Sequence, residues 1–180
     1  MRDFTQDRCP VRTIIHIVMV LTGVLTLSQA AEANSLPVPS GAVVLTMTEA
    51  GGGAQDRPTI RLDLETLRSL PAERYRTGTI WTDGPHTFEG VLLRDLLRAA
   101  GASGTRVRAI ALNDYAIDIP LDEETTDAAL VAYALDGHPM SVRDKGPLWI
   151  VYPYDSDAAY RSEVIYTRSI WQLSELEILD

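Results

Sequence analysis

The amino-acid sequence predicts an α+β domain that is mostly β, and three observations support this class. Short runs rich in Val, Ile, Leu and Thr recur between Gly, Pro, Asn and Asp, as in strands joined by turns. Clear helical spacing of apolar residues occurs in one segment, residues 88–100. The chain has 180 residues, 46% of them hydrophobic, which suits one domain with a single core.

Residues 1–33 have the pattern of a secretory signal peptide. Three arginines precede an apolar run at residues 13–27, and the small residues that follow it fit a cleavage site. A transmembrane anchor is the alternative, but the run is shorter than the ~20 residues that a spanning helix needs. We therefore expect cleavage, a periplasmic location in a bacterium with two membranes, no membrane insertion of the mature protein, and a single domain at residues 34–180.

The first half of this domain is expected to combine strands with two helices. Strands are predicted at residues 42–48, 59–64 and 77–82, from their β-branched and alternating apolar residues. A short helix at 65–70 is stopped by Pro71, because proline cannot continue it. The sequence Asp83-Gly84-Pro85 predicts a turn, and a longer helix is expected over 88–100, ended by Gly101.

The second half of the domain is expected to consist of strands. Residues 106–112 and 116–120 flank Asn113-Asp114, which is typical of a hairpin turn. Further strands are predicted at 130–135, 148–152 and 173–179, the last from its strict alternation.

Net charge and cysteine position limit the kinds of function. A formal net charge of −9 argues against nucleic acid or anionic lipid as partners, because both need a positive field. The only cysteine, Cys9, lies before the apolar run and would be removed with the signal peptide. His86 and His138 have no Cys or Glu at ligand spacing, so no metal site is expected. The sequence has no nucleophile signature and no glycine-rich phosphate loop after a strand.

A polar loop at residues 137–149 is the most informative segment for a ligand site. It carries Arg143 and Asp144 between an Asp136-Gly137 turn and an apolar strand. A charged loop held by apolar strands is a common way for a β scaffold to present a ligand site. Composition alone favours a solvated ion pair for Arg143 and Asp144.

Several segments, taken in order, resemble the molybdopterin-binding fold of sulfite oxidase. They are Trp81-Thr82-Asp83, residues 88–97 (FEGVLLRDLL), Asn113-Asp114-Tyr115, residues 136–140 with 145–148, and residues 168–173. The chain is most similar to small secreted proteins that bind pterins without being molybdenum enzymes, the PruR-type periplasmic pterin-binding regulators. This resemblance implies a sulfite-oxidase-like fold and a pterin ligand, such as tetrahydromonapterin or a neopterin, with no metal.

The resemblance also implies a function. It suggests a non-catalytic periplasmic protein that senses a pterin and regulates an inner-membrane partner, a cyclic-di-GMP cyclase or phosphodiesterase with a periplasmic domain. The alternative is a molybdopterin-dependent oxidoreductase or a subunit of one. Catalytic members of the fold hold molybdenum through a cysteine thiolate, and residues 34–180 contain no cysteine. A third alternative is a structural β domain with a vestigial pocket.

The residues expected to contact the pterin are those able to stack on a flat ring or pair with its polar edges. With the resemblance taken into account they are Trp81, Asp114, Tyr115, Arg143, Asp144, Tyr154, Arg168, Ser169 and Trp171. From position alone, Trp81 is equally expected to be a stacking wall or a core residue. For Tyr115, an ordinary hairpin aromatic is slightly favoured over a ligand contact. Trp171 is more often a core residue at such a place, and Trp149 is expected in the core.

Overall fold

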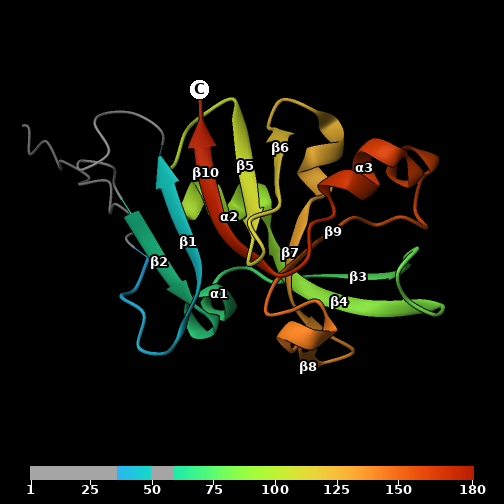
Figure 1. Ribbon diagram of the computed structural model, residues 1–180, viewed down its shortest axis with the longest axis horizontal. Coiled ribbons are helices and arrows are strands. Elements are labelled where there is room, and N and C mark those ends of the chain that lie inside the picture. The colour runs from blue at the N-terminus through green and yellow to red at the C-terminus, as the bar shows by residue number, and fades with distance from the viewer. Residues whose placement is uncertain (1–35, 50–58) are drawn as a thin grey trace, which may run out of the picture. The chain divides into compact units, whose positions relative to one another are not determined.

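The computed structural model describes residues 36–49 and 59–180. The predicted signal peptide and Cys9 lie outside the described residues. The described chain forms two β-sheets with short helices around them, which confirms the α+β, mostly β class (Figure 1). No helix in residues 36–49 or 59–180 is both long and apolar enough to cross a membrane.

The first sheet has five strands in the order β2-β1-β10-β5-β6. The strands are β1 (Val43–Glu49), β2 (Thr59–Asp63), β5 (Arg106–Ala111), β6 (Ala116–Pro120) and β10 (Leu173–Leu179). Strand β10 pairs in parallel with β1 and antiparallel with β5. Figure 1 shows the red C-terminal strand lying between the cyan β1 and the yellow-green β5. The last strand of the chain is therefore the central strand of this sheet.

The second sheet is antiparallel and has the order β3-β4-β7-β8, with β9 also pairing with β7. Its strands are β3 (Glu73–Gly78), β4 (Pro85–Leu92), β7 (Leu130–Leu135), β8 (His138–Pro139) and β9 (Trp149–Val151). An isolated bridge between Trp149 and Trp171 links the start of β9 to the segment just before β10. This bridge brings the end of one sheet next to the start of the central strand of the other.

Three α-helices and three 3-10 helices connect the strands. They are α1 (Leu64–Ser69), α2 (Leu93–Ala99), η1 (Glu124–Ala128), η2 (Val142–Asp144), η3 (Ala158–Arg161) and α3 (Glu163–Arg168). Helix α1 begins at Asp63, whose carboxylate accepts hydrogen bonds from Thr66 N–H and from the backbone N–H groups of Ser40 and Gly41. These bonds hold the pKa of Asp63 far below its ordinary value.

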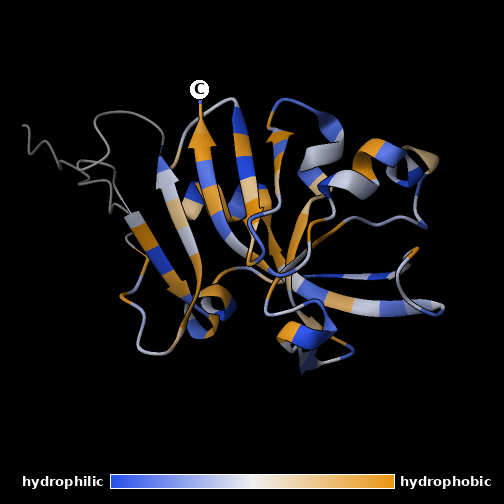
Figure 2. Cartoon of the chain, in the orientation of Figure 1, coloured by the Kyte–Doolittle hydropathy of each residue, from blue (hydrophilic) through white to orange (hydrophobic). Residues whose placement is uncertain are grey.

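The hydrophobic core lies mainly on β7, β9 and β10 and on the inner faces of β4 and α2. Trp149 and Phe88 are fully buried, with their rings edge to face at 5.4 Å. Figure 2 shows β7 as largely hydrophobic and the edge strand β3 as largely hydrophilic. The difference follows from position, because β7 is paired on both sides and β3 on one.

Most predicted elements are confirmed within one or two residues, but two predictions are wrong. Residues 85–92 form β4, and the helix predicted over 88–100 begins only at Leu93. Gly90 allows this strand to approach β7 closely, since a Cβ there would lie 2.1 Å from the carbonyl oxygen of Val131. The strand predicted over 77–82 instead runs from Glu73 to Gly78. Residues 79–84 then form a loop that matters for the site.

Candidate functional site

A cavity of about 630 Å³ lies where three segments of the described chain meet. The segments are the loop at residues 79–84, the turn between β5 and β6, and α3 with the residues after it. Its lining residues are Ile80, Trp81, Ala111, Asn113, Tyr115, Glu163, Tyr166, Thr167, Ser169, Ile170 and Trp171. Its volume lies within the range usual for sites that bind a small organic molecule.

Aromatic rings form one corner of the cavity. The ring of Trp81 lies edge to face with Trp171, at 5.5 Å and 76°, and with Tyr166, at 5.8 Å and 87°. Behind them, the ring of the buried Trp149 lies 5.9 Å from that of Trp81. Rings held nearly at right angles let a flat ligand stack on one face while its edge meets another ring. The corner therefore suits a planar heteroaromatic molecule.

The cavity has few polar groups, and their partners differ. Ser169 Oγ accepts from the hydroxyl of Tyr154 and donates to the carbonyl of Ile165, each at 2.7 Å. Its hydroxyl is thus already committed to the protein. In contrast, several polar groups of the lining make no hydrogen bond with the described residues, among them the Glu163 carboxylate, the side-chain NH₂ of Asn113 and the hydroxyls of Tyr115 and Tyr166. These groups are available to a ligand.

The electrostatics of the lining are simple. Glu163 is the only charged residue among the lining residues, and no Lys or Arg lies among them. A carboxylate accepts hydrogen bonds from amino and ring N–H groups and repels phosphate. The lining thus favours a neutral or cationic ligand that presents donors along one edge.

Four of the nine predicted site residues line the cavity. They are Trp81, Tyr115, Ser169 and Trp171, which come from three separate segments. Asp114 is exposed and adopts a positive φ of 64° in the neighbouring turn, outside the lining. The structure thus brings together three of the four aromatic residues of the prediction, Trp81, Tyr115 and Trp171.

Two predicted site residues lie behind the cavity and support it. Tyr154 is 2% exposed, and burial raises the pKa of its hydroxyl to about 12, so that the hydroxyl donates to Ser169. Arg168 is buried and directs its guanidinium to the carboxylate of Glu123 through two hydrogen bonds, of 2.5 and 3.1 Å. Arg168 therefore faces an ion-pair partner and does not line the cavity.

The polar loop contributes no lining residue. Arg143 and Asp144 are exposed on η2, where Asp144 accepts a hydrogen bond from the hydroxyl of Ser141 at 2.7 Å. This loop instead approaches the site through its backbone. The carbonyl of Val142 accepts from the side-chain amide of Gln172, next to Trp171, at 2.8 Å.

Sequence reasoning missed α3 and the residues it supplies to the site. Glu163, Tyr166 and Thr167 lie on this helix, and Asn113 lies in the predicted hairpin turn but was not selected. A local signal for the helix was present, because Ser162 is a good N-cap residue and accepts from the N–H of Ile165. The acidic Glu163 in the first turn is a second such signal.

Comparison with known proteins identifies the family. The model of the oxidoreductase molybdopterin binding domain matches residues 55–159, more than half of the 180 residues. The matched region includes Trp81, Asn113 and Tyr115 but ends before α3. None of the curated proteins matches the chain. The expected sulfite-oxidase-like relationship is confirmed: this chain belongs to the oxidoreductase molybdopterin-binding domain family.

Proposed function

We propose that this protein binds a pterin without molybdenum, in the periplasm, and acts as a non-catalytic sensor. The observation that carries the proposal is the cavity itself. It combines an aromatic corner, made by Trp81, Tyr166 and Trp171, with a single carboxylate from Glu163. A pterin is a flat bicycle with an amino group and a ring N–H on one edge, and these two features complement it.

Each lining group has a role in this proposal. The face of Trp81 or Trp171 would stack on the bicycle. The Glu163 carboxylate would accept from the amino group and ring N–H, and the Asn113 NH₂ would donate to the ring carbonyl. A buried polar edge left without partners costs about 1–3 kcal/mol per group, so such pairing would select pterins over other flat rings.

The molybdenum cofactor of the family does not fit the residues present. A molybdenum ion in this fold family calls for a soft thiolate, and the only cysteine of the chain, Cys9, precedes the domain. The phosphate of molybdopterin calls for Lys or Arg, and the lining offers only the negative Glu163. In the described residues, no group of three or more His, Cys, Asp or Glu side chains could hold a metal ion. These points favour the sensor over a molybdopterin-dependent oxidoreductase.

A partner protein is part of the proposal. Four exposed apolar side chains, Ile80, Leu112, Tyr115 and Trp171, lie at or beside the cavity. A protein docked there would contact the ligand site and would sense whether it is filled. The net charge of −9 favours a basic face on that partner. The family resemblance suggests the periplasmic domain of an inner-membrane cyclic-di-GMP cyclase or phosphodiesterase.

Ligand titration combined with metal analysis tests the proposal. The full sequence is expressed in a bacterial host, recovered from the periplasmic fraction, and titrated calorimetrically with tetrahydromonapterin and tetrahydroneopterin. Micromolar or tighter binding without molybdenum supports the sensor. Stoichiometric molybdenum in the purified protein would instead establish the oxidoreductase alternative. The mass of the same sample shows whether residues 1–33 have been removed.

Two variants locate the binding site. Glu163→Gln and Trp81→Ala should each weaken pterin binding at least about tenfold, equivalent to ~1.4 kcal/mol. Glu175→Gln is the matched control, because Glu175 is an exposed glutamate on β10 outside the cavity. Equal affinity in Glu163→Gln and Glu175→Gln would place the pterin elsewhere.

A further inference from the structure

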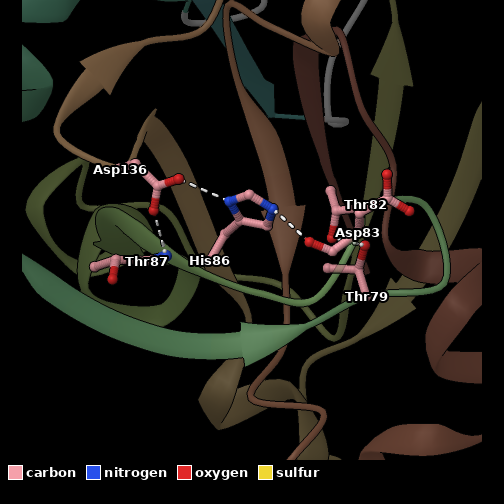
Figure 3. Close-up of polar contacts among 6 residues, drawn as sticks. All are labelled: Thr79, Thr82, Asp83, His86, Thr87 and Asp136. Carbon is pink, nitrogen blue, oxygen red and sulfur yellow. Dashed lines mark hydrogen bonds and ion pairs between the residues drawn. The ribbon is translucent and has the colours of Figure 1, made fainter.

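His86, at the start of β4, sits between two hydrogen-bond acceptors (Figure 3). Its Nδ1 lies 2.7 Å from a carboxylate oxygen of Asp136, in the turn between β7 and β8. Its Nε2 lies 3.1 Å from the backbone carbonyl oxygen of Asp83. Neither a carboxylate nor a carbonyl can donate, so the imidazole must donate through both nitrogens to make both bonds.

This geometry requires a proton. A neutral imidazole carries one N–H and satisfies one of the two acceptors, whereas the imidazolium carries two and satisfies both. Loss of the proton therefore costs either the contact with Asp136 or the contact with Asp83. The side chain of His86 is 30% exposed, so solvent can exchange its proton.

The contact with Asp83 leads directly to the cavity. Asp83 lies near the end of the loop at residues 79–84, which carries Trp81 into the aromatic corner. Within that loop, Thr79 Oγ1 accepts from the backbone N–H of Trp81 at 3.0 Å. Thr79 Oγ1 also contacts Thr82 Oγ1 at 2.9 Å (Figure 3). His86 thus holds the loop at Asp83, and the hydrogen bonds of Thr79 hold the part of the same loop that carries Trp81.

The contact with Asp136 connects His86 to a residue that the backbone of β4 holds in place. The Asp136 carboxylate also accepts from the N–H of Thr87 at 2.9 Å, and its own N–H donates to the Thr87 carbonyl at 2.8 Å. These two hydrogen bonds hold Asp136 to the backbone of β4 independently of His86. Protonated His86 connects this fixed carboxylate to the loop.

We propose that His86 is a proton-dependent positioning residue that holds the Trp81 side of the cavity, so that the site binds its ligand more tightly when His86 is charged. This inference rests on the proposed pterin site and adds regulation to it. The charged groups around the imidazole are Asp83 from the loop, Asp136 from the β7–β8 turn, and Arg76 from β3, which acts on Asp136. Two of the three are negative, and they favour the imidazolium.

The direction of the pH dependence follows from these contacts. The hydrogen bond to Asp136 raises the pKa of His86 above its ordinary value, and the same bond lowers the pKa of Asp136. Both contacts of His86, with Asp136 and with Asp83, are present at a pH between these two pKa values. One of them is lost when His86 loses its proton as the pH rises through its raised pKa. The contact with Asp136 is weakened when Asp136 gains a proton as the pH falls through its lowered pKa.

Pterin titration across pH tests this role. The affinity for tetrahydromonapterin is measured at several points from about pH 5.5 to 8.5 in the wild type and in His86→Gln. The ligand also titrates, but the ratio of the two dissociation constants at each pH cancels that contribution. The wild type should lose about two- to fivefold in affinity relative to His86→Gln as the pH rises, the size expected of an exposed ion pair. His138→Gln, at an exposed histidine on β8, should follow the wild type.

A ligand-free measurement separates this inference from the pterin proposal. The imidazole nitrogens of His86 and the indole N–H of Trp81 are followed by NMR during a pH titration. In the wild type, the Trp81 signal should shift at the pH where His86 is half protonated. Loss of this shift in His86→Gln supports the positioning role even if no pterin binds. A constant affinity ratio, or a Trp81 signal that ignores the His86 midpoint, would overturn it. Absence of pterin binding at every pH would overturn the proposed function alone.

Discussion

The two walls of the cavity are built in opposite ways. The α3 wall, residues 163–171, rests on buried groups: Arg168, Ser169 and Ile170 are 8%, 2% and 3% exposed. The loop wall, residues 79–84, is more open to solvent, and its Ile80 is 62% exposed. The α3 wall is held by hydrogen bonds inside the protein, whereas the loop wall is held by Thr79 and His86 near the surface.

Because of this difference, the α3 wall contributes mainly to the stability of the domain, whereas the loop wall is the one able to move. Segments with few buried contacts open at low free energy, whereas buried bonded segments open only with the whole domain. A site with one wall of each kind can keep a fixed surface for recognition and a second surface that moves when a ligand or a partner binds. We therefore expect substitutions of the buried residues of the α3 wall to lower stability and substitutions in the loop wall to change binding.

The largest effect is expected from Ser169→Ala in the α3 wall. The change removes the acceptor of the buried Tyr154 hydroxyl, which would cost about 1–3 kcal/mol of unfolding free energy. Urea unfolding measures it. Ser156→Ala is the matched control, since Ser156 is an exposed serine that also donates to a carbonyl, at 2.7 Å. A Ser169→Ala protein as stable as Ser156→Ala would contradict the tight bonding of this wall.

Glu123→Gln should cost less, about 1 kcal/mol, because the ion pair with Arg168 is partly open to solvent. The hydrogen bond from Arg168 lowers the pKa of Glu123. The pair therefore stabilises the fold fully above the ordinary pKa of a glutamate, and this stabilisation is lost as the pH falls from there through the lowered pKa of Glu123. The free energy of unfolding, measured at pH 7 and at pH 4, should differ between the wild type and Glu123→Gln, and the difference should be smaller at pH 4. The neighbouring exposed Glu124→Gln should show no such difference at either pH.

Thr79→Val probes the loop wall, with an expected loss of about 0.5 kcal/mol in stability. Its main effect should be on pterin affinity, because the Trp81 N–H loses its acceptor. Thr82→Val removes only the contact between the two hydroxyls and leaves the Trp81 bond in place. Calorimetric titration should rank Thr79→Val below Thr82→Val in affinity. The reverse order would mean that the Trp81 backbone is held by something else.

The smallest effect is expected from Tyr152→Phe, a change of no more than about 0.5 kcal/mol. The Tyr152 hydroxyl is buried and has no hydrogen-bond partner among the described residues, so its loss removes no bond. Tyr154→Phe is the matched comparison, because this equally buried hydroxyl donates to Ser169. Thermal unfolding should separate the two variants. Equal losses would mean that burial, and not bonding, stabilises the α3 wall.

The sequence predicted most strands and the aromatic part of the site. Alternation identified β2 and β10, and the turn at Asn113-Asp114 identified β5 and β6. The resemblance assigned Trp81, Tyr115 and Trp171 to one site, and the structure brings these three residues to one cavity. Helix α3 was missed because six residues are too few for a helical period to appear. Arg168 was assigned to the ligand because its partner, Glu123, lies 45 residues away in sequence. Such distant pairings decide which way a side chain points, and local pattern does not contain them.

The helix predicted over 88–100 failed for a related reason. Its apolar residues belong to two elements, β4 and α2, whose patterns join without a break. The pairing of β4 with β3 on one side and β7 on the other decides the strand, and only the close approach at Gly90 marks it locally. Tertiary pairing thus overrides local spacing here.

The central place of β10 has a consequence for how the chain acquires its fold. Strand β1 starts at Val43 and pairs with a strand that ends at Leu179, so the first sheet needs both ends of the domain at once. A polypeptide emerging in order from its N-terminus cannot complete this sheet until its last strand is available. The α3 wall directly precedes that strand, so the ligand site also forms late.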